Sequence, residues 1–205
     1  MNKPTDKTPI LESEKYYHIF NRAIGNEKLF VDETDYIYFL SKLERYVLPI
    51  ADLIAYCLIP NHFHFFVRIL DYEVISKNIK INSSNTSEEL TKQSFSNFFN
   101  SYTKTYNLRH NRKGKLFMLP YKRILVEDDT YFISIINYIH RNPLHHGLVK
   151  KHIDRKFSSY TAYLSQNKTK INRDLGLEFY GNLENFLLFH KENRAKVGFE
   201  IYLKE

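Results

Sequence analysis

The sequence predicts an α+β fold, a ferredoxin-like (RRM-like) sandwich with one antiparallel sheet. Two observations predict it. Strand and helix signals follow the order strand, helix, strand, strand, helix, strand, with a helix added at the end. Side chains also point alternately to the two faces of the central strands, so that one face of the sheet is apolar and suits the first two helices. We expect the third helix to lie on the other, open face.

Each expected element has its own signal. Apolar residues recur every three or four positions in the helical segments. The strand segments are short, rich in aromatic and β-branched residues, and bounded by turn residues. Pro49 and Pro143 are expected to end the first and third helices, because proline disfavours helical geometry in the residue before it. We expect strand 15–22, helix 32–48, strands 52–59 and 62–70, helix 87–107, strand 116–126 with a break at Pro120, and helix 128–142.

The chain is long enough for one domain with a real core. We expect residues 1–14 to be disordered, 15–164 to form the domain, and 165–205 to form a C-terminal extension packed on it. Short helices are expected at 157–164 and 183–190. Residues 76–89 carry many Asn, Ser and Thr residues, which favours a flexible connection.

The composition restricts the protein class. No run approaches the roughly 18 apolar residues that span a membrane, and the N-terminus has no apolar signal core. We therefore expect a cytoplasmic, nucleoid-associated protein with no membrane partner. The single cysteine, Cys57, lies in an apolar run and is expected to be a buried free thiol.

The positive charge is concentrated in one segment. The formal net charge is +7, with 30 Lys and Arg against 23 Asp and Glu. Residues 101–123 contain seven basic residues and no acidic residue, which accounts for the whole excess. Such a segment is typical of proteins that bind a polyanion such as nucleic acid. A solvated basic loop is the alternative.

The strand at 62–70 carries two histidines at alternate positions. Successive strand side chains point to opposite faces, so His62 and His64 share one face while Phe63 and Phe65 line the other. The Cα atoms of the two histidines would lie about 6 to 7 Å apart. Both rings could then reach one metal ion at about 2.1 Å. Two exposed histidines without a ligand are the alternative.

The expected third helix adds a phenol and an amide. Tyr138 and Asn142 are four residues apart and so lie on one helix face. If this face meets the open side of the sheet, two imidazoles and one amide oxygen suit Mg²⁺ or Mn²⁺ better than structural zinc. A metal beside a tyrosine indicates nucleophilic displacement on a phosphodiester. Tyr131, seven residues earlier, is a rival for the nucleophile.

Four motifs, in this order, resemble those of one family. The chain contains Tyr-His-Ile-Phe-Asn-Arg at 17–22, Ala-Tyr-Cys-Leu-Ile-Pro-Asn-His-Phe-His at 55–64, Tyr-Ile-His-Arg-Asn-Pro at 138–143 and Ser-Ser-Tyr at 158–160. This set resembles the REP-associated tyrosine transposases, within the single-tyrosine HUH transposase superfamily. The resemblance extends over residues 16–164.

The resemblance implies an HUH endonuclease that nicks single-stranded DNA and transfers the strand, as in DNA transposition and recombination. His62, His64 and Asn142 would bind a divalent metal, Mg²⁺ or Mn²⁺, and Tyr138 would be the nucleophile. The products would be a 5′-phosphotyrosine and a free 3′-hydroxyl, formed without a nucleotide cofactor. The implied partner is single-stranded DNA with a palindromic hairpin or repeat, and the protein would be a monomer or a homodimer.

We expect the DNA to follow residues 101–123, where aromatic residues offer stacking surfaces for bases. The alternative is that most of these aromatic residues belong to the core, as the helical spacing of Phe98, Phe99 and Tyr102 favours. Three histidines near the end of the third helix, His140, His145 and His146, are expected to face solvent. Two other functions stay open: a non-catalytic nucleic-acid-binding regulator on the same fold, and a metal phosphodiesterase that uses water. The expected DNA contacts are Arg109, Arg112, Lys113, Lys115, Lys122 and Arg123.

Overall fold

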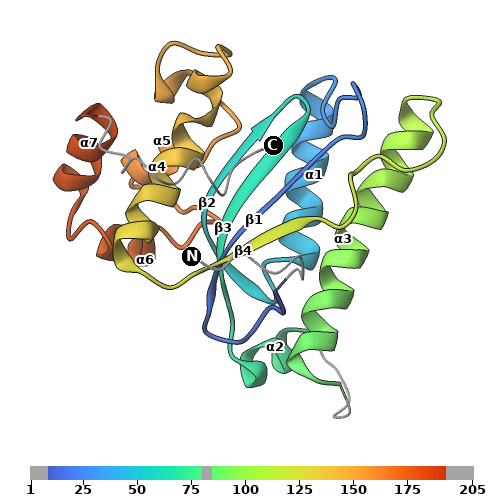
Figure 1. Cartoon of the computed structure of the whole chain (residues 1–205), viewed down its shortest axis with the longest axis horizontal. Helices are drawn as coiled ribbons and strands as arrows, with labels where there is room; N and C mark the ends of the chain where they lie inside the picture. Colours follow the sequence, from blue (N-terminus) through green and yellow to red (C-terminus); the bar gives the residue numbers. More distant parts are fainter. Residues whose placement is uncertain (1–8, 80–84, 193–205) are drawn as a thin grey trace, which may run out of the picture.

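The computed structural model describes residues 9–79 and 85–192, and its centre is a four-stranded antiparallel sheet (Figure 1). The strand order is β2-β3-β1-β4, in which the β2-β3 hairpin lies beside β1. This arrangement confirms the predicted α+β sandwich. The strands are β1 (Tyr16–Arg22), β2 (Ala51–Ile59), β3 (His62–Ile69) and β4 (Lys122–Val126).

Helices cover both faces of the sheet (Figure 1). On one face lie α1 (Glu33–Tyr46) and α3 (Ser87–Arg109), which also pack on each other. On the other face α4 (Asp129–His145) crosses β2 and β3. The C-terminal elements gather around α4: η1 (His152–Asp154), α5 (Tyr160–Leu164), α6 (Arg173–Glu178) and α7 (Leu183–Glu192).

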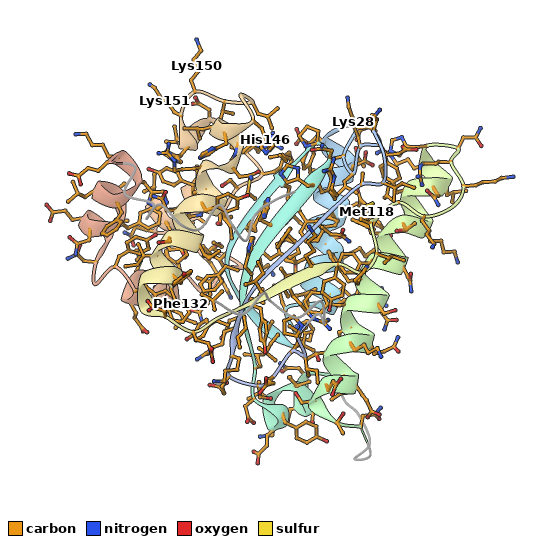
Figure 2. The ribbon with its side chains drawn as sticks, viewed as in Figure 1. Lys28, Met118, Phe132, His146, Lys150 and Lys151 are labelled. Atoms are coloured by element: carbon orange, nitrogen blue, oxygen red, sulfur yellow. The ribbon has the colours of Figure 1, made fainter. Side chains whose placement is uncertain are left out.

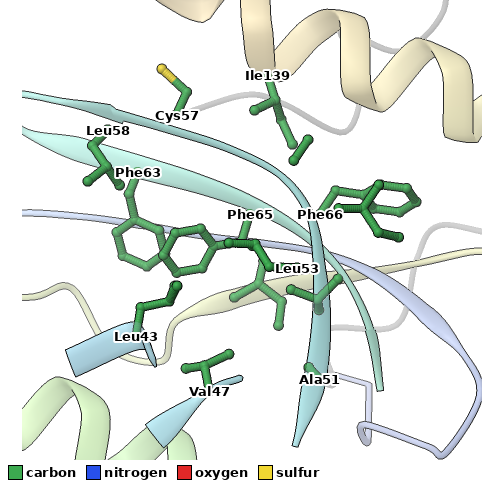
Figure 3. Packing of buried hydrophobic residues seen from close by; sticks show 14 of the residues in the cluster. Leu43, Val47, Ala51, Leu53, Cys57, Leu58, Phe63, Phe65, Phe66 and Ile139 are labelled. Atoms are coloured by element: carbon green, nitrogen blue, oxygen red, sulfur yellow. The ribbon is translucent and has the colours of Figure 1, made fainter. Parts of the chain in front are cut away.

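Strand alternation divides the core into two layers. Phe63 and Phe65 pack against Phe39 of α1, with ring centroids 5.2 and 6.0 Å apart, and Figure 3 shows them on the side of Leu43. Phe66 packs on Phe132 of α4, at 5.7 Å. The polar alternate positions of β3 therefore face α4.

Cys57 lies in the buried part of β2 and is free, as predicted. Burial raises the pKa of its thiol to about 12. A thiol with this pKa stays protonated near neutral pH, and only the thiolate is a good nucleophile. Cys57 is therefore a packing residue.

Helix α4 does not end before Pro143. It runs through this proline to His145, so the predicted end at Asn142 was wrong. Asn142 and Pro143 are both buried beside the sheet. Packing in the last turn thus outweighs the loss of one backbone hydrogen bond.

Two segments are more ordered than expected. A short helix, α2 (Tyr72–Ile79), overlaps the start of the segment 76–89 that was expected to be a flexible connection. Asp71 accepts a hydrogen bond from the backbone N–H of Glu73 at 2.8 Å, and Ile75 is buried, so a cap and an apolar anchor fix this short helix. Within the N-terminal segment expected to be disordered, residues 1–8 lie outside the described residues, whereas Leu11 is buried. In the described ranges no helix is long and apolar enough to cross a membrane.

Candidate active site

The site lies at the start of β3, on the face covered by α4. His62 and His64 are the first and third residues of β3, and only 4% and 1% of their surfaces are exposed. Their ring centroids lie 5.1 Å apart with the planes nearly perpendicular, at 88°. The alternative of two exposed strand histidines is therefore wrong.

Helix α4 places an amide between the two rings. Oδ1 of Asn142 lies 3.1 Å from Nε2 of His62, and Nδ2 of Asn142 lies 3.3 Å from Nε2 of His64. The same Nδ2 donates to the hydroxyl of Tyr138 at 3.4 Å. The ring of Tyr138 is perpendicular to that of His64, with centroids 5.3 Å apart. The fold thus brings together the four side chains that the sequence singled out for metal binding and nucleophilic attack.

The hydrogen-bonding pattern at His62 suits a cation. Nδ1 faces Oδ1 of Asn61 at 2.9 Å and Nε2 faces Oδ1 of Asn142, so amide oxygens lie on both sides of the ring. A neutral imidazole carries one N–H, so one of its two nitrogens presents a lone pair. If that nitrogen is Nε2, it and Oδ1 of Asn142 offer two adjacent acceptors to a cation.

The distances in this site also fit a divalent ion. Neighbouring ligands of an octahedral ion, each about 2.1 Å from it, lie about 3.0 Å apart. The contact between Oδ1 of Asn142 and Nε2 of His62, 3.1 Å, is close to that separation, whereas the amide nitrogen that faces His64 at 3.3 Å is not itself a metal ligand. In the described part of the chain no group of three His, Cys, Asp or Glu residues could hold a metal. The side chains here that could hold a divalent ion are His62, His64 and the amide oxygen of Asn142, a set compatible with Mg²⁺ or Mn²⁺.

His18 supports His64 from behind, a role that sequence reasoning did not assign. It is fully buried on β1, and its Nε2 lies 3.0 Å from Nδ1 of His64. Because Asn142 donates toward Nε2 of His64, the network assigns the His64 proton to Nδ1, which donates to His18. Burial, and then the neighbouring His64, lower the pKa of His18 well below its usual value, so His18 is neutral. The strand alternation that paired His62 with His64 applies to β1 as well and could have found it.

Position distinguishes the two candidate tyrosines. Tyr138 is half-buried, one helical turn from Asn142 and in contact with the rings of His18 and His64. Tyr131 lies seven residues earlier, about 10.5 Å along the helix axis, and is 40% exposed. Of the two tyrosines, the fold therefore brings Tyr138, and not Tyr131, to the histidine pair.

A cavity of about 530 Å³ opens beside the two histidines. Its walls come from β1, from the turn at Gly25 and from residues 118–122, and Met118 is labelled in Figure 2. Phe20, Met118, Leu119 and Pro120 make much of the lining apolar, while Lys122 lies 5.6 Å above the ring of Phe20. An apolar wall beside a cation suits a flat aromatic group that carries negative charge.

Two of the six expected DNA contacts hold the protein itself together. Arg109 forms ion pairs with Asp32, at 2.5 Å, and with the buried carboxylate of Asp35. Arg112 donates to Oδ1 of Asn107 at 2.9 Å and to the carbonyl oxygen of residue 115 at 2.6 Å. Both guanidinium groups therefore fix the end of α3 and the loop after it.

The other four expected contacts lie in different places. Arg123 is paired with Ile19 in the sheet, on the face opposite the histidines, and its guanidinium lies 5.1 Å above the ring of Tyr121. Lys113 and Lys115 are exposed on the loop after α3. Lys122 is exposed and lines the cavity beside the histidines. Lys122 is thus the only one of these four that reaches the site.

The aromatic residues of this segment are largely core. Tyr102, Tyr106 and Phe117 are buried, and Tyr102 donates a hydrogen bond to the carbonyl oxygen of Leu29. Tyr121 is half-buried and stacks on Phe95, with centroids 5.4 Å apart. They therefore pack the α3 side rather than present rings to bases.

His140 is buried, so its predicted exposure was wrong, while His145 and His146 are exposed as predicted. Nε2 of His140 lies 2.7 Å from Oγ of Ser159, and Nδ1 lies 2.9 Å from Nε2 of His190. The partner His190 belongs to α7, fifty residues later in the chain. Nothing near His140 in the sequence indicates that α7 covers it.

The fold and the site define a class of architecture: an α+β sandwich with a histidine pair on one sheet face and a tyrosine helix packed over it. A solved structure shares the α+β fold of this chain, that of the REP-associated tyrosine transposase bound to a REP hairpin. The match has a TM-score of 0.54, 13% sequence identity, and covers 81% of this chain and 87% of that chain. At this identity the similarity shows a common fold. No protein-family model matches the sequence, and neither does any curated protein.

Proposed function

We propose that this protein is a metal-dependent enzyme that nicks single-stranded DNA at hairpin or repeat sequences and transfers the strand through a phosphotyrosine. One observation carries the proposal: the amide of Asn142 lies between Nε2 of His62 and Nε2 of His64 and contacts the hydroxyl of Tyr138. The fold shared with a REP-associated tyrosine transposase bound to a REP hairpin supports it.

In the proposed reaction Tyr138 attacks a phosphodiester. Its phenol loses its proton to solvent as the oxygen forms a bond to phosphorus, the bond from phosphorus to the 3′ oxygen breaks, and that oxygen takes up a proton from solvent. The products are a 5′-phosphotyrosine and a free 3′-hydroxyl. Attack of a 3′-hydroxyl on the phosphotyrosine reverses the step and joins strands, so no nucleotide cofactor is needed. A divalent ion held by His62, His64 and Asn142 would withdraw charge from the phosphate.

The remaining side chains position the reactants. His18 keeps the proton of His64 on Nδ1, so that Nε2 presents a lone pair toward Asn142. Tyr138 and Asn142 lie one turn apart on a single helix, which fixes the phenol relative to the ligand set. The cavity beside Phe20 would take the nucleotide next to the scissile phosphate, with Lys122 near its charge.

The test is covalent attachment to DNA. Single-stranded oligonucleotides with palindromic hairpins and random flanks, labelled at either end, are incubated with the protein and Mg²⁺ or Mn²⁺ and separated on denaturing gels. We expect the 3′ label to move with the protein and the 5′ label to be released. Tyr138→Phe and chelation should each abolish attachment, while Tyr131→Phe is the matched control that retains it.

Other outcomes would identify another function. Metal-dependent cutting that survives Tyr138→Phe would mean a phosphodiesterase that uses water. DNA binding with neither cutting nor attachment would mean a non-catalytic regulator. Either result would overturn the proposal.

A further inference from the structure

A second pocket lies beside α4, away from the sheet and outside the site described above. Its volume is about 480 Å³, and it opens between the end of α4, the loop 150–152 and α7. No Asp or Glu of the described chain lines it. Figure 2 shows Lys150 and Lys151 projecting from the loop after α4. The cations in its lining are Arg141, Lys150, Lys151 and Lys191.

Two buried polar atoms in this pocket lack hydrogen-bond partners. Nε of Arg141 and Nε2 of His152 are both inaccessible to solvent and contact no donor or acceptor among residues 9–79 and 85–192. Native proteins rarely leave such atoms unpaired. Arg141 is half-buried, and no Asp or Glu of the described chain lines the pocket around it. An anion in the pocket would supply the opposite charge that is missing there.

The pocket lies next to the candidate active site around α4. Arg141 follows Tyr138 by three residues and precedes Asn142 by one, so it occupies the neighbouring helix face. The ring of His146 lies 4.8 Å from that of His62. In the view of Figure 2 the labels of Lys150, Lys151, His146 and Met118 follow one another across the molecule. A strand that passes over Tyr138 could therefore reach both pockets.

We infer that this pocket binds phosphate groups of the DNA strand that Tyr138 attacks, on the side of Tyr138 away from the cavity beside Phe20. A guanidinium can donate two parallel hydrogen bonds to a phosphate, and the loop lysines add charge without needing fixed geometry. The identity of the strand rests on the proposed function. The anion site itself rests on four cations and two unpaired buried atoms.

The test measures how DNA binding depends on salt. Affinity for a fluorescein-labelled single-stranded oligonucleotide of mixed sequence is measured by anisotropy in the Tyr138→Phe background, which prevents covalent attachment. In Lys150→Gln/Lys151→Gln we expect the slope of log affinity against log salt to fall by about 1.4, since each phosphate contact on a single strand contributes about 0.7. Binding should weaken on the order of tenfold at about 0.1 M salt. Lys77→Gln/Lys92→Gln is the matched control, because it removes the same charge from exposed sites on α2 and α3.

A second variant separates binding from folding. Arg141→Met should weaken binding while its melting temperature stays unchanged or rises, because the change removes a half-buried cation without a carboxylate partner in the described chain. A lower melting temperature with unchanged affinity would overturn the inference.

The two proposals can fail separately. An unchanged salt slope in the double-lysine variant, together with covalent attachment of the protein that retains Tyr138, would overturn the inference and leave the proposed function standing. A reduced slope in a protein that never attaches to DNA would support the anion site and overturn the proposed function.

Discussion

Helix α4 contributes to two buried histidine networks, and they differ in how well hydrogen-bond donors match acceptors. In the first, Ser159 donates to Nε2 of His140, Nδ1 of His140 donates to Nε2 of His190, and Nδ1 of His190 donates to the carbonyl oxygen of Phe186. One neutral tautomer of each imidazole satisfies every ring nitrogen. This network joins α4, α7 and the segment before α5, and needs no ligand.

The second network, on the sheet side of α4, has one unmatched atom among the described residues. Nδ1 of His18 is buried with no hydrogen-bond partner there, and both ring nitrogens of His62 face amide oxygens, a type of group that can also bind a cation. Burial does not distinguish the networks, since His64 and His140 are each 1% exposed. The difference is that the first network satisfies every ring nitrogen, whereas the second leaves the Nδ1 proton of His18 without an acceptor in the described chain and sets an imidazole nitrogen of His62 beside the amide oxygen of Asn142. We therefore expect the first network to be structural, and ligand binding by the second belongs to the proposed function.

The largest expected effect is loss of metal binding in His64→Ala. Loss of an outer partner of a metal ligand typically lowers metal affinity by about 10 to 100-fold, so loss of a ligand should exceed that. Titration with Mn²⁺, followed by calorimetry, measures the affinity, and the DNA gel measures attachment. His140→Ala is the matched control, since it removes an equally buried imidazole from the same region, and the folded variant should bind Mn²⁺ like the wild type. Equal Mn²⁺ affinity in wild type and His64→Ala would contradict the assignment of metal binding to the second network.

A substitution in the first network, His140→Ala, should lower the stability of the fold. His140→Ala leaves the acceptor of His190 unpaired and opens a cavity, so the free energy of unfolding should fall by about 3 kcal/mol. Urea unfolding followed by circular dichroism measures this change. His145 is the exposed last residue of α4. The free energy of unfolding of His145→Ala should stay within about 0.5 kcal/mol of wild type. A similar loss in both variants would mean that the His140 network is not what stabilises this side of the fold.

An intermediate effect is expected at His18. His18→Leu removes the acceptor for Nδ1 of His64, which should lower Mn²⁺ affinity by about 10 to 100-fold. His18→Gln keeps an acceptor at a similar distance and should recover part of the affinity. Equal affinity in the Leu and Gln variants would show that His18 acts by packing alone.

Local sequence spacing predicted the site, whereas contacts distant in sequence had to come from the structure. The alternation of His62 and His64 and the four-residue spacing of Tyr138 and Asn142 follow from strand and helix geometry, and the fold brings these groups together. The exposure predicted for His140 was wrong because its partner lies on α7.

The charges of residues 101–123 also show that contacts distant in sequence cannot be predicted from local patterns. Counting charges between residues 101 and 123 gave six expected DNA contacts, but Asp32 and Asp35 pair with Arg109 from another part of the chain. The acidic partners of a cation cannot be found by counting charges along a segment. The cations around Arg141, in contrast, are dispersed in sequence and gather only in the folded chain.

The smallest expected effect is a pH dependence of stability that comes from the complete network. Burial lowers the pKa of His190 to about 3 and that of His140 well below its usual value. Between about pH 3 and the unfolded value of about 6.5, the unfolded chain binds protons at these side chains that the folded chain does not. The free energy of unfolding therefore falls as the pH falls through this window, by about 2 kcal/mol for His190 between about pH 8 and pH 5. Urea unfolding across this range should show a slope smaller by about one proton in His190→Gln than in wild type, and equal slopes would mean that His190 is not held neutral by burial.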